Sequence, residues 1–216
     1  MPRFIEEALY SALEDFKLSI LLNDGYDSKY VNLDVPPFTL IGATTRIGKL
    51  SVPLKQRFGI IEKLNFYKIF ELNSIVKRLS TVLETKINED ACSLISSVSR
   101  STPRNAIRIF KRIRDYVFIQ NKNLIEKNDV KHALSNLKIF RLGLLEQDIE
   151  YLKILKNKTN CYLGLNSLSK IIGDENINLL DDIEPYLLTL GFVEINSKGR
   201  KITPRGIDYL NNYRIF

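Results

Sequence analysis

Apolar side chains recur at three- and four-residue intervals over residues 2–16, and this spacing predicts a helix with one buried face. Two short alternating runs follow, at residues 18–22 and 30–33. Asn23-Asp24-Gly25 and further polar residues separate the two runs. The segment 17–34 is therefore predicted to form a β-hairpin.

A continuous apolar run follows Pro36-Pro37 and covers residues 38–43 without polar alternation. A strand buried on both faces of a parallel sheet has this composition. Polar residues, among them Thr45, stand at the carboxyl end of the predicted strand. Open α/β sheets bind ligands at that edge, so the pattern favours a ligand site there.

The middle of the chain is predicted to be a small bundle of four helices. Two amphipathic stripes cover residues 72–83 and 91–98. Pro103 opens a third helix that runs to about residue 120, and Asn128-Asp129 caps a fourth.

The last part of the chain combines helices with a hairpin. Gly173 and Gly191 each end a predicted helix. The predicted elements are helices at about 146–158, 167–172 and 177–190 and strands at 192–195 and 200–203. Three helices followed by a basic hairpin predict a winged helix-turn-helix, a DNA-binding design in which a helix enters the major groove and the wing follows the backbone.

The composition of the 216-residue chain, with 44% hydrophobic and 26% charged residues, is that of folded globular proteins and excludes disordered and collagen-like classes. No uninterrupted apolar run approaches the roughly 18 residues of a membrane span. Glu6 and Glu7 stand where a secretory signal would be basic and then apolar. We therefore expect a cytoplasmic protein without a membrane partner.

Cysteine and histidine are too few and too scattered for a zinc site. Cys92 and Cys161 lack C-x-x-C spacing, and His132 is the single histidine. We expect no metal at these residues and interpret both thiols as small core residues in a reducing compartment.

Positive charge is concentrated in the middle third of the chain. The net charge is +7, and residues 66–140 hold 14 basic and 7 acidic side chains, whereas residues 1–65 hold 8 of each and residues 141–216 hold 10 of each. Near the end of the chain, Ile195 to Ile207 contains four cations and no acid, namely Lys198, Arg200, Lys201 and Arg205. Both features favour an anionic partner.

Taken singly, several polar residues have simple structural explanations. A hydroxyl at a strand end, such as that of Thr45, often bonds to the local backbone. An arginine before a Phe-Gly turn, such as Arg57, is more often a surface charge than a catalytic group. The helix after Pro103 carries five cations that either form a solvated face or contact phosphates, namely Arg104, Arg108, Lys111, Arg112 and Arg114.

The order of the motifs changes this picture. Residues 37–46 are Pro-Phe-Thr-Leu-Ile-Gly-Ala-Thr-Thr-Arg, residues 53–60 are Pro-Leu-Lys-Gln-Arg-Phe-Gly-Ile, and residues 101–106 are Ser-Thr-Pro-Arg-Asn-Ala. Further motifs are Leu163-Gly164-Leu165, Glu184-Pro185-Tyr186-Leu187, Gly191-Phe192 and Thr203-Pro204-Arg205. With this set, the chain resembles the RuvB family, the AAA+ motors of bacterial Holliday-junction branch migration, over nearly its full length.

The resemblance implies a multidomain fold of the class α/β plus α. It implies that residues 1–66 form the carboxyl-terminal part of an AAA+ P-loop core, with a β-hairpin insertion at about 17–34. Residues 67–139 then correspond to a helical AAA+ lid domain, and residues 140–216 to a winged-helix DNA-binding domain.

The resemblance also assigns site residues. Thr45 matches the sensor 1 residue, and Arg57 matches the arginine finger that reaches the nucleotide of the neighbouring subunit; these are the expected catalytic residues. A guanidinium suits a finger because its planar, always-charged fork spreads stabilisation over phosphoryl oxygens. Nucleotide contacts are also implied for Glu14-Asp15-Phe16, Tyr67 and the sensor 2 residue Arg104. The implied cofactors are ATP and Mg²⁺, with most of their ligands in a preceding segment that the chain does not contain.

The partners follow from the same resemblance. The hairpin matches the insertion by which RuvB grips RuvA, with Val31 and Leu33 as apolar contacts; the alternative is that both pack on the sheet. In the wing, Arg200 matches a DNA-contacting arginine with Lys198 beside it, whereas a basic position of some relatives is here Ile195; the alternative is a solvated turn. The implied assembly is a homohexamer on double-stranded DNA at a Holliday junction, with RuvC associated indirectly, in bacterial DNA recombination, DNA repair and the SOS response.

One part of the family pattern is missing. The sequence contains neither a G-x-x-x-x-G-K-[ST] phosphate loop nor the acidic pair that holds Mg²⁺. We therefore expect an ATP-hydrolysing DNA helicase subunit that is inactive by itself. Two alternatives stay open: a non-catalytic winged-helix DNA-binding module, and another AAA+ protein of the clamp-loader type.

Overall fold

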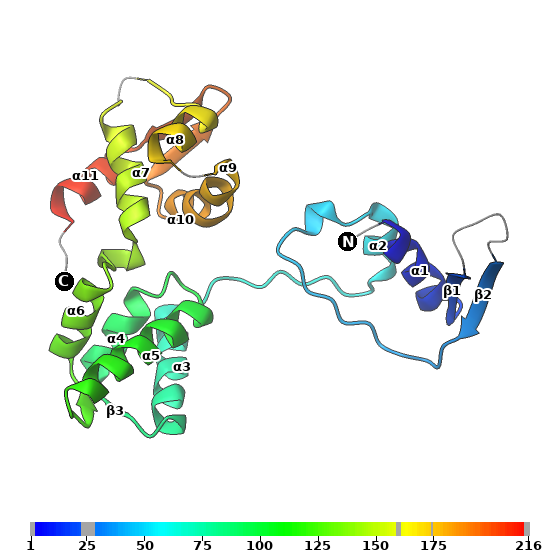
Figure 1. Ribbon diagram of the computed structural model, residues 1–216, viewed down its shortest axis with the longest axis horizontal. Coiled ribbons are helices and arrows are strands. Elements are labelled where there is room, and N and C mark those ends of the chain that lie inside the picture. Colours follow the sequence, from blue (N-terminus) through cyan, green and yellow to red (C-terminus); the bar gives the residue numbers. More distant parts are fainter. Residues whose placement is uncertain (1–2, 23–28, 159–160, 174, 214–216) are drawn as a thin grey trace. The chain divides into compact units, whose positions relative to one another are not determined.

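The computed structural model describes residues 3–22, 29–158, 161–173 and 175–213. The chain divides into two compact units, Met1–Leu64 and Asn65–Phe216, and each is described by itself (Figure 1). The elements of the first unit are α1 (Arg3–Glu14), β1 (Lys17–Leu22), β2 (Lys29–Asp34), a 3₁₀ turn (Ile47–Lys49) and α2 (Val52–Arg57).

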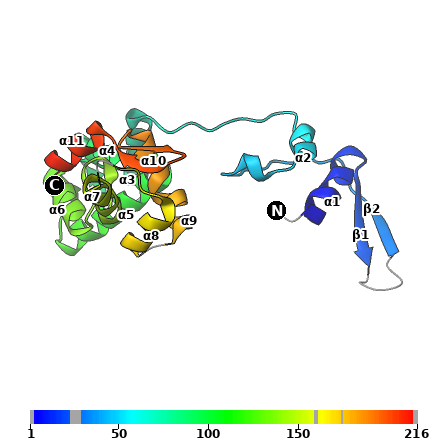
Figure 2. The same cartoon turned by 90° about the horizontal axis from the view of Figure 1, so that it is seen from above.

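The predicted β-hairpin is confirmed. β1 and β2 pair antiparallel, with Leu18 opposite Leu33 and Ile20 opposite Val31. Phe16 adopts a φ of 53° between α1 and β1, and the hairpin packs beside α1 (Figure 2). The Phe16 ring meets the Phe38 ring edge to face at 6.4 Å, which holds the segment after the hairpin against the end of α1.

The expectation of a buried strand over residues 38–43 is wrong. The segment is irregular, and Ile41 is 89% exposed. A strand in the interior of a sheet needs a hydrogen-bonded neighbour on each side, and among the described residues no strand pairs with this segment. The apolar run therefore has the composition of a buried strand without the sheet that would bury it.

The second unit begins with the predicted helical bundle, called here the lid (residues 65–139). Its elements are α3 (Ile69–Val82), β3 (Lys86–Ile87), α4 (Glu89–Ser97), α5 (Pro103–Ile119), β4 (Leu124–Ile125) and α6 (Lys127–Asn136). The four predicted helices are confirmed, and the short parallel pair β3–β4 was not predicted. Apolar residues from all four helices form one buried core, in which Val76, Ile95, Phe110 and Leu134 are fully buried.

The rest of the second unit, residues 140–213, is a winged helix with its own core (Figure 1). A 3₁₀ turn (Arg141–Gly143) leads into α7 (Glu146–Lys156), α8 (Leu165–Ile172), α9 (Asn176–Asn178), a π-helical turn (Leu179–Ile183), α10 (Glu184–Thr189), β5 (Val193–Asn196), β6 (Gly199–Ile202) and α11 (Pro204–Asn212). Residues 176–189 are called here the third helix, and the hairpin β5–β6 is called the wing. Gly173 (φ 77°) and Gly191 (φ 68°) take the left-handed conformation that ends the helices before them, as predicted.

The two cysteines differ in environment. Cys92 is buried in the lid core, as predicted. The prediction for Cys161 is wrong, because this residue is exposed in the connection between α7 and α8, where its thiol lies 3.6 Å from the Lys158 carbonyl oxygen. Across the residues that the structure describes, no helix is both long and apolar enough to cross a membrane.

Candidate nucleotide-contacting residues and nucleic-acid interface

Arg57 ends α2 and lies against α1 of its own chain. Its Nη2 is 2.8 Å from the Glu14 Oε1, its Nη1 donates to the Pro53 carbonyl oxygen at 3.0 Å, and its guanidinium carbon is 4.3 Å from the centre of the Tyr10 ring. The Tyr10 hydroxyl in turn is 2.7 Å from the Ser51 Oγ. The structure thus brings together two of the predicted nucleotide-contacting residues, Glu14 and Arg57, from two helices.

The ion pair between Arg57 and Glu14 is weak. The Arg57 side chain is 22% exposed and that of Glu14 is 55% exposed, and a pair this open to water contributes about 0–1 kcal/mol. The Arg57 Nε is buried and has no hydrogen-bond partner among the described residues. The guanidinium therefore keeps the capacity to exchange Glu14 for a phosphate.

The other predicted residues of the first unit lie at the surface. Thr45 is exposed in the irregular segment before the 3₁₀ turn, where the neighbouring Thr44 hydroxyl accepts a hydrogen bond from the Arg46 amide at 3.0 Å. Asp15 and Phe16 are exposed after α1. In the described part of the chain, no contact is recorded between Thr45 and Arg57.

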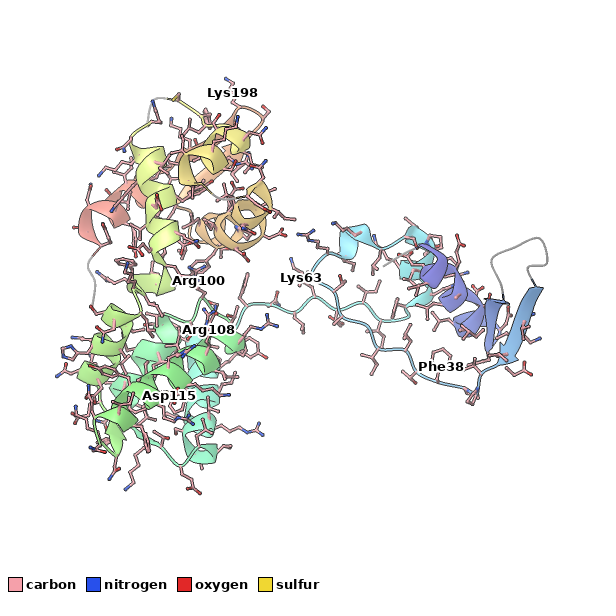
Figure 3. The ribbon with its side chains drawn as sticks, viewed as in Figure 1. Phe38, Lys63, Arg100, Arg108, Asp115 and Lys198 are labelled. Atoms are coloured by element: carbon pink, nitrogen blue, oxygen red, sulfur yellow. The ribbon has the colours of Figure 1, made fainter. Side chains whose placement is uncertain are left out.

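Tyr67 and Arg104 belong to the lid. The Tyr67 amide donates to the Ser101 carbonyl oxygen at 3.0 Å, which fastens the start of the lid to the loop before α5. Arg104 is exposed in the first turn of α5, and Arg108 follows one turn later on the same helix (Figure 3). Both guanidinium groups are open to solvent, so they can bind an anion there.

Magnesium has no site among these residues. No group of three or more His, Cys, Asp or Glu side chains that could hold a metal ion occurs in the described ranges. The ion needs several oxygen ligands at one place, so the described residues do not fit Mg²⁺.

The wing carries Lys198 at its tip, directed away from the domain (Figure 3). The Asn196 side chain accepts a hydrogen bond from the Lys198 amide at 2.8 Å, which shapes the turn. Gly199 has a φ of 132°, and a Cβ there would lie 2.4 Å from the Leu163 carbonyl oxygen. Only glycine fits, so the strand β6 can approach residue 163 closely.

Arg200 points inward rather than toward solvent. Its Nε is 2.9 Å from the Glu184 Oε1 and its Nη2 is 3.2 Å from the Glu184 Oε2, and the Tyr151 hydroxyl donates to the Glu184 Oε1 at 2.9 Å. The hydrogen bond to Glu184 raises the pKa of Arg200, and burial raises that of Tyr151, so Arg200 stays charged and Tyr151 neutral. The phosphate contact predicted for Arg200 is untested, and it would require Arg200 to leave Glu184.

Cations lie on the wing and, with Arg205, directly after it at the start of α11, but they are absent from the third helix. The third helix contains no lysine or arginine, and it exposes Asp181 and Asp182 near its middle. Lys198 and Arg205 are exposed, and Lys201 is half-buried with its Nζ 5.6 Å from the centre of the Tyr162 ring. Insertion of the third helix into a DNA groove would bring carboxylates toward phosphates, so the wing is the better candidate interface.

Arg100 joins the lid to the winged helix (Figure 3). Its Nε donates to the Gly143 carbonyl oxygen at 2.8 Å, its Nη2 pairs with the Asp148 carboxylate, and its guanidinium lies 4.8 Å from the centre of the Tyr186 ring. Burial raises the pKa of Asp148 in spite of the charge of Arg100. The contacts of the Arg100 side chain therefore connect the loop before Arg104 to the winged helix.

The hairpin exposes the two predicted partner-binding residues. Val31 is 37% exposed and Leu33 is 47% exposed, and residues two apart in a strand lie on the same face. The alternative, in which they pack on a sheet, has no support among the described residues.

Sequence reasoning missed Tyr10 and Glu184, the partners of the predicted Arg57 and Arg200, and it missed Arg100 with its partner Asp148. The two acids left a signal in the sequence, because each stands at a position where the periodicity of its helix requires a buried residue. A buried acid needs a cation, which Arg200 and Arg100 supply.

Comparisons with known proteins agree with this architecture. Three family models match in sequence order: the Holliday junction DNA helicase RuvB P-loop domain over residues 1–64, the RuvB AAA lid domain over 67–139 and the RuvB C-terminal winged helix domain over 141–211. The Holliday junction branch migration complex subunit RuvB of Ehrlichia ruminantium is 43% identical over 211 residues, which cover 98% of this chain and 63% of the relative. The corresponding subunit of Helicobacter acinonychis is 42% identical over 201 residues, which cover 93% and 60%.

Solved structures give the same result. The Thermotoga maritima RuvB Holliday junction branch migration motor matches with a TM-score of 0.81 and 38% identity, over 98% of this chain and 66% of that one. A variant of the same protein matches with a TM-score of 0.82 and 38% identity, over 98% and 67%. The chain spans somewhat less than two thirds of the length of its curated relatives. Since the three domain matches follow RuvB order and the likeness extends over nearly the whole sequence, the chain belongs to the RuvB family.

Proposed function

We propose that this chain is the carboxyl-terminal part of an ATP-driven DNA helicase subunit that moves Holliday junctions in recombination and repair. The observation that carries the proposal is the 43% identity, over 98% of the chain, to a protein named Holliday junction branch migration complex subunit RuvB. The proposed working form is a homohexamer on duplex DNA with RuvA as partner and RuvC associated indirectly. Val31 and Leu33 are the proposed contacts to RuvA, supported by their exposure on one face of the hairpin.

The proposed nucleotide contacts are Glu14, Asp15, Phe16, Tyr67 and Arg104, with Arg57 and Thr45 as the catalytic pair. ATP supplies the phosphoryl group whose transfer to water drives the motor. Arg57 acts as the finger: it leaves the weak pair with Glu14 and directs its charge at the nucleotide of a neighbouring subunit. The partial exposure of Arg57 and its weak pair with the exposed Glu14 support this role.

Duplex DNA is the proposed partner of the wing. Lys198 and the other cations on and beside the wing that have no carboxylate partner among the described residues contact phosphates, which gives binding that is strong at low salt and independent of sequence. The absence of cations from the third helix supports backbone contact over base recognition.

The experiment mixes this chain with the separately expressed P-loop segment of a RuvB relative and measures ATP hydrolysis with and without duplex DNA. We expect hydrolysis only in the mixture, and a decrease in kcat by a factor of about 10³ on Arg57→Ala. Lys55→Ala is the matched control, since Lys55 is a cation of the same helix with no assigned role, and it should leave kcat unchanged.

A specific observation favours a second candidate, a non-catalytic DNA-binding module: the sequence has no phosphate loop. Duplex binding without any hydrolysis in the mixture would support this module and count against the motor. Hydrolysis that is insensitive to RuvA would instead indicate an AAA+ protein of the clamp-loader type.

A further inference from the structure

The ion pair between Arg200 and Glu184 is almost closed to water. The Arg200 side chain is 14% exposed and the Glu184 side chain is 3% exposed. The guanidinium meets the carboxylate through two hydrogen bonds, at 2.9 and 3.2 Å, and this fork-to-fork geometry is the strong form of the contact. Arg200 therefore differs from Lys198, which projects from the same wing into solvent.

The pair joins three elements of the winged helix. Arg200 lies in β6, Glu184 begins α10 of the third helix, and Tyr151, whose hydroxyl donates to Glu184, lies in α7. The backbone of Arg200 also bonds to Leu163 in both directions, at 2.9 and 2.8 Å. Side chain and backbone together fix where the wing stands on the domain.

Transfer of Arg200 to a DNA phosphate would undo this arrangement. The Glu184 carboxylate would stay behind, buried and without a cation, and burial of an unpaired charge is strongly unfavourable. The wing would also lose its attachment to the third helix at the moment of binding. The remaining cations, Lys198, Lys201 and Arg205, can approach phosphates without such a cost, because no carboxylate is recorded as their ion-pair partner among the described residues.

We propose that Arg200 is a positioning residue of the DNA-binding wing, which holds the wing in place through Glu184, while Lys198, Lys201 and Arg205 make the phosphate contacts. The inference rests on the proposed function of the wing in duplex binding. It predicts that replacement of either Arg200 or Glu184 weakens the binding of duplex DNA, although the two charges are opposite.

The test measures the affinity of the 216-residue chain for a fluorescently labelled duplex by anisotropy, at salt concentrations from about 50 to 200 mM. Arg200→Gln and Glu184→Gln keep a hydrogen-bonding side chain at each position, and Lys198→Ala is the control for a direct phosphate contact. We expect Arg200→Gln and Glu184→Gln each to weaken binding about threefold to tenfold with the salt slope unchanged. Lys198→Ala should lower the slope by about 0.9.

Opposite results overturn the inference. If Arg200 contacts a phosphate directly, Glu184→Gln frees a cation, so binding becomes tighter and the salt slope steeper. Arg200→Gln would then lower the slope by about one unit. Unchanged affinity in both variants would also overturn the inference, because the wing would then need no such attachment.

Hydrogen exchange of the wing amides separates this inference from the proposed function. Both Gln variants should accelerate exchange at residues 196–199 while the helical amides of α5 in the lid stay protected, which shows that the fold is intact. If the unmodified chain does not bind duplex although its wing amides exchange slowly, the result counts against the proposed function and leaves the inference intact. Unchanged exchange in both variants would overturn the inference whatever the DNA result.

Discussion

At the scale of single residues, Gly143 permits the contact between the lid and the winged helix. Its φ is 74°, and a Cβ at this position would lie 2.1 Å from the Val98 carbonyl oxygen. Its own carbonyl oxygen accepts the hydrogen bond from Arg100, at 2.8 Å. A residue without a side chain is thus required both for the backbone conformation and for the close approach of the two domains.

Gly143→Ala should therefore destabilise the chain by about 2–3 kcal/mol, because strain in the left-handed region is added to a steric clash with the backbone. Urea unfolding followed by circular dichroism measures this loss. Gly164→Ala is the matched control, since Gly164 has a φ of −68° and a Cβ there would meet nothing within 4 Å. An equal loss in both variants would show that Gly143 has no special role.

At the scale of elements, Asp129 stabilises the start of α6. It is 3% exposed, accepts a hydrogen bond from the Glu126 amide at 3.0 Å and pairs with the Lys122 ammonium. Desolvation raises the pKa of Asp129, but the Lys122 ammonium and the Glu126 amide outweigh it, so this pKa lies below its ordinary value of 3.8. The ionised form is therefore the one that the fold favours.

A carboxyl group with a lowered pKa in the folded state contributes stability above its unfolded pKa, and the contribution is lost as the pH falls through the folded value. Asp129→Asn keeps the acceptor for the Glu126 amide but removes the charge. We expect a loss of about 0.5–1 kcal/mol at pH 7 that shrinks below pH 3.8. Urea unfolding of both proteins between about pH 2.5 and 7 measures the difference. A difference that stays constant down to the lowest pH would contradict the charge-based explanation.

At the scale of the whole molecule, the two units differ in how much apolar surface they bury. Among the side chains of Met1–Leu64 whose burial the structure describes, which exclude residues 1–4 and 19–30, only Ala12 and Leu54 are buried hydrophobic residues, and Ile60 and Leu64 are 81% and 93% exposed. Asn65–Phe216 contains two extended cores, one in the lid and one in the winged helix. Burial of apolar area is the main source of stability, so the first unit is the weaker one.

Amide hydrogen exchange of the intact chain should show this difference. We expect the helical amides of α1 to exchange at least about tenfold faster than those of α5, although both segments are regular helices. The comparison of helix with helix removes the effect of secondary structure itself. Equal protection in α1 and α5 would mean that the first unit gains stability from contacts that burial does not reveal.

The sequence by itself determined the helices of the lid, the winged helix and the hairpin, because helix and strand periodicities and glycine stops act over a few neighbouring residues. The pair β3–β4 escaped it, because two-residue strands are too short to show a period. It also determined the family, because the motifs follow one another in a fixed order. The predicted site residues stay proposals, since sequence position does not state what a side chain faces.

Tertiary structure decided the environment of individual side chains. Residues 38–43 have the composition of a strand, but a strand exists only where a partner supplies hydrogen bonds. Arg57 forms an ion pair with Glu14, which is 43 residues away in the chain, and Arg200 forms one with Glu184, which is 16 residues away. Contacts between residues so far apart are set by packing and burial, which no local pattern encodes, and they determine which cations stay available to an anionic partner.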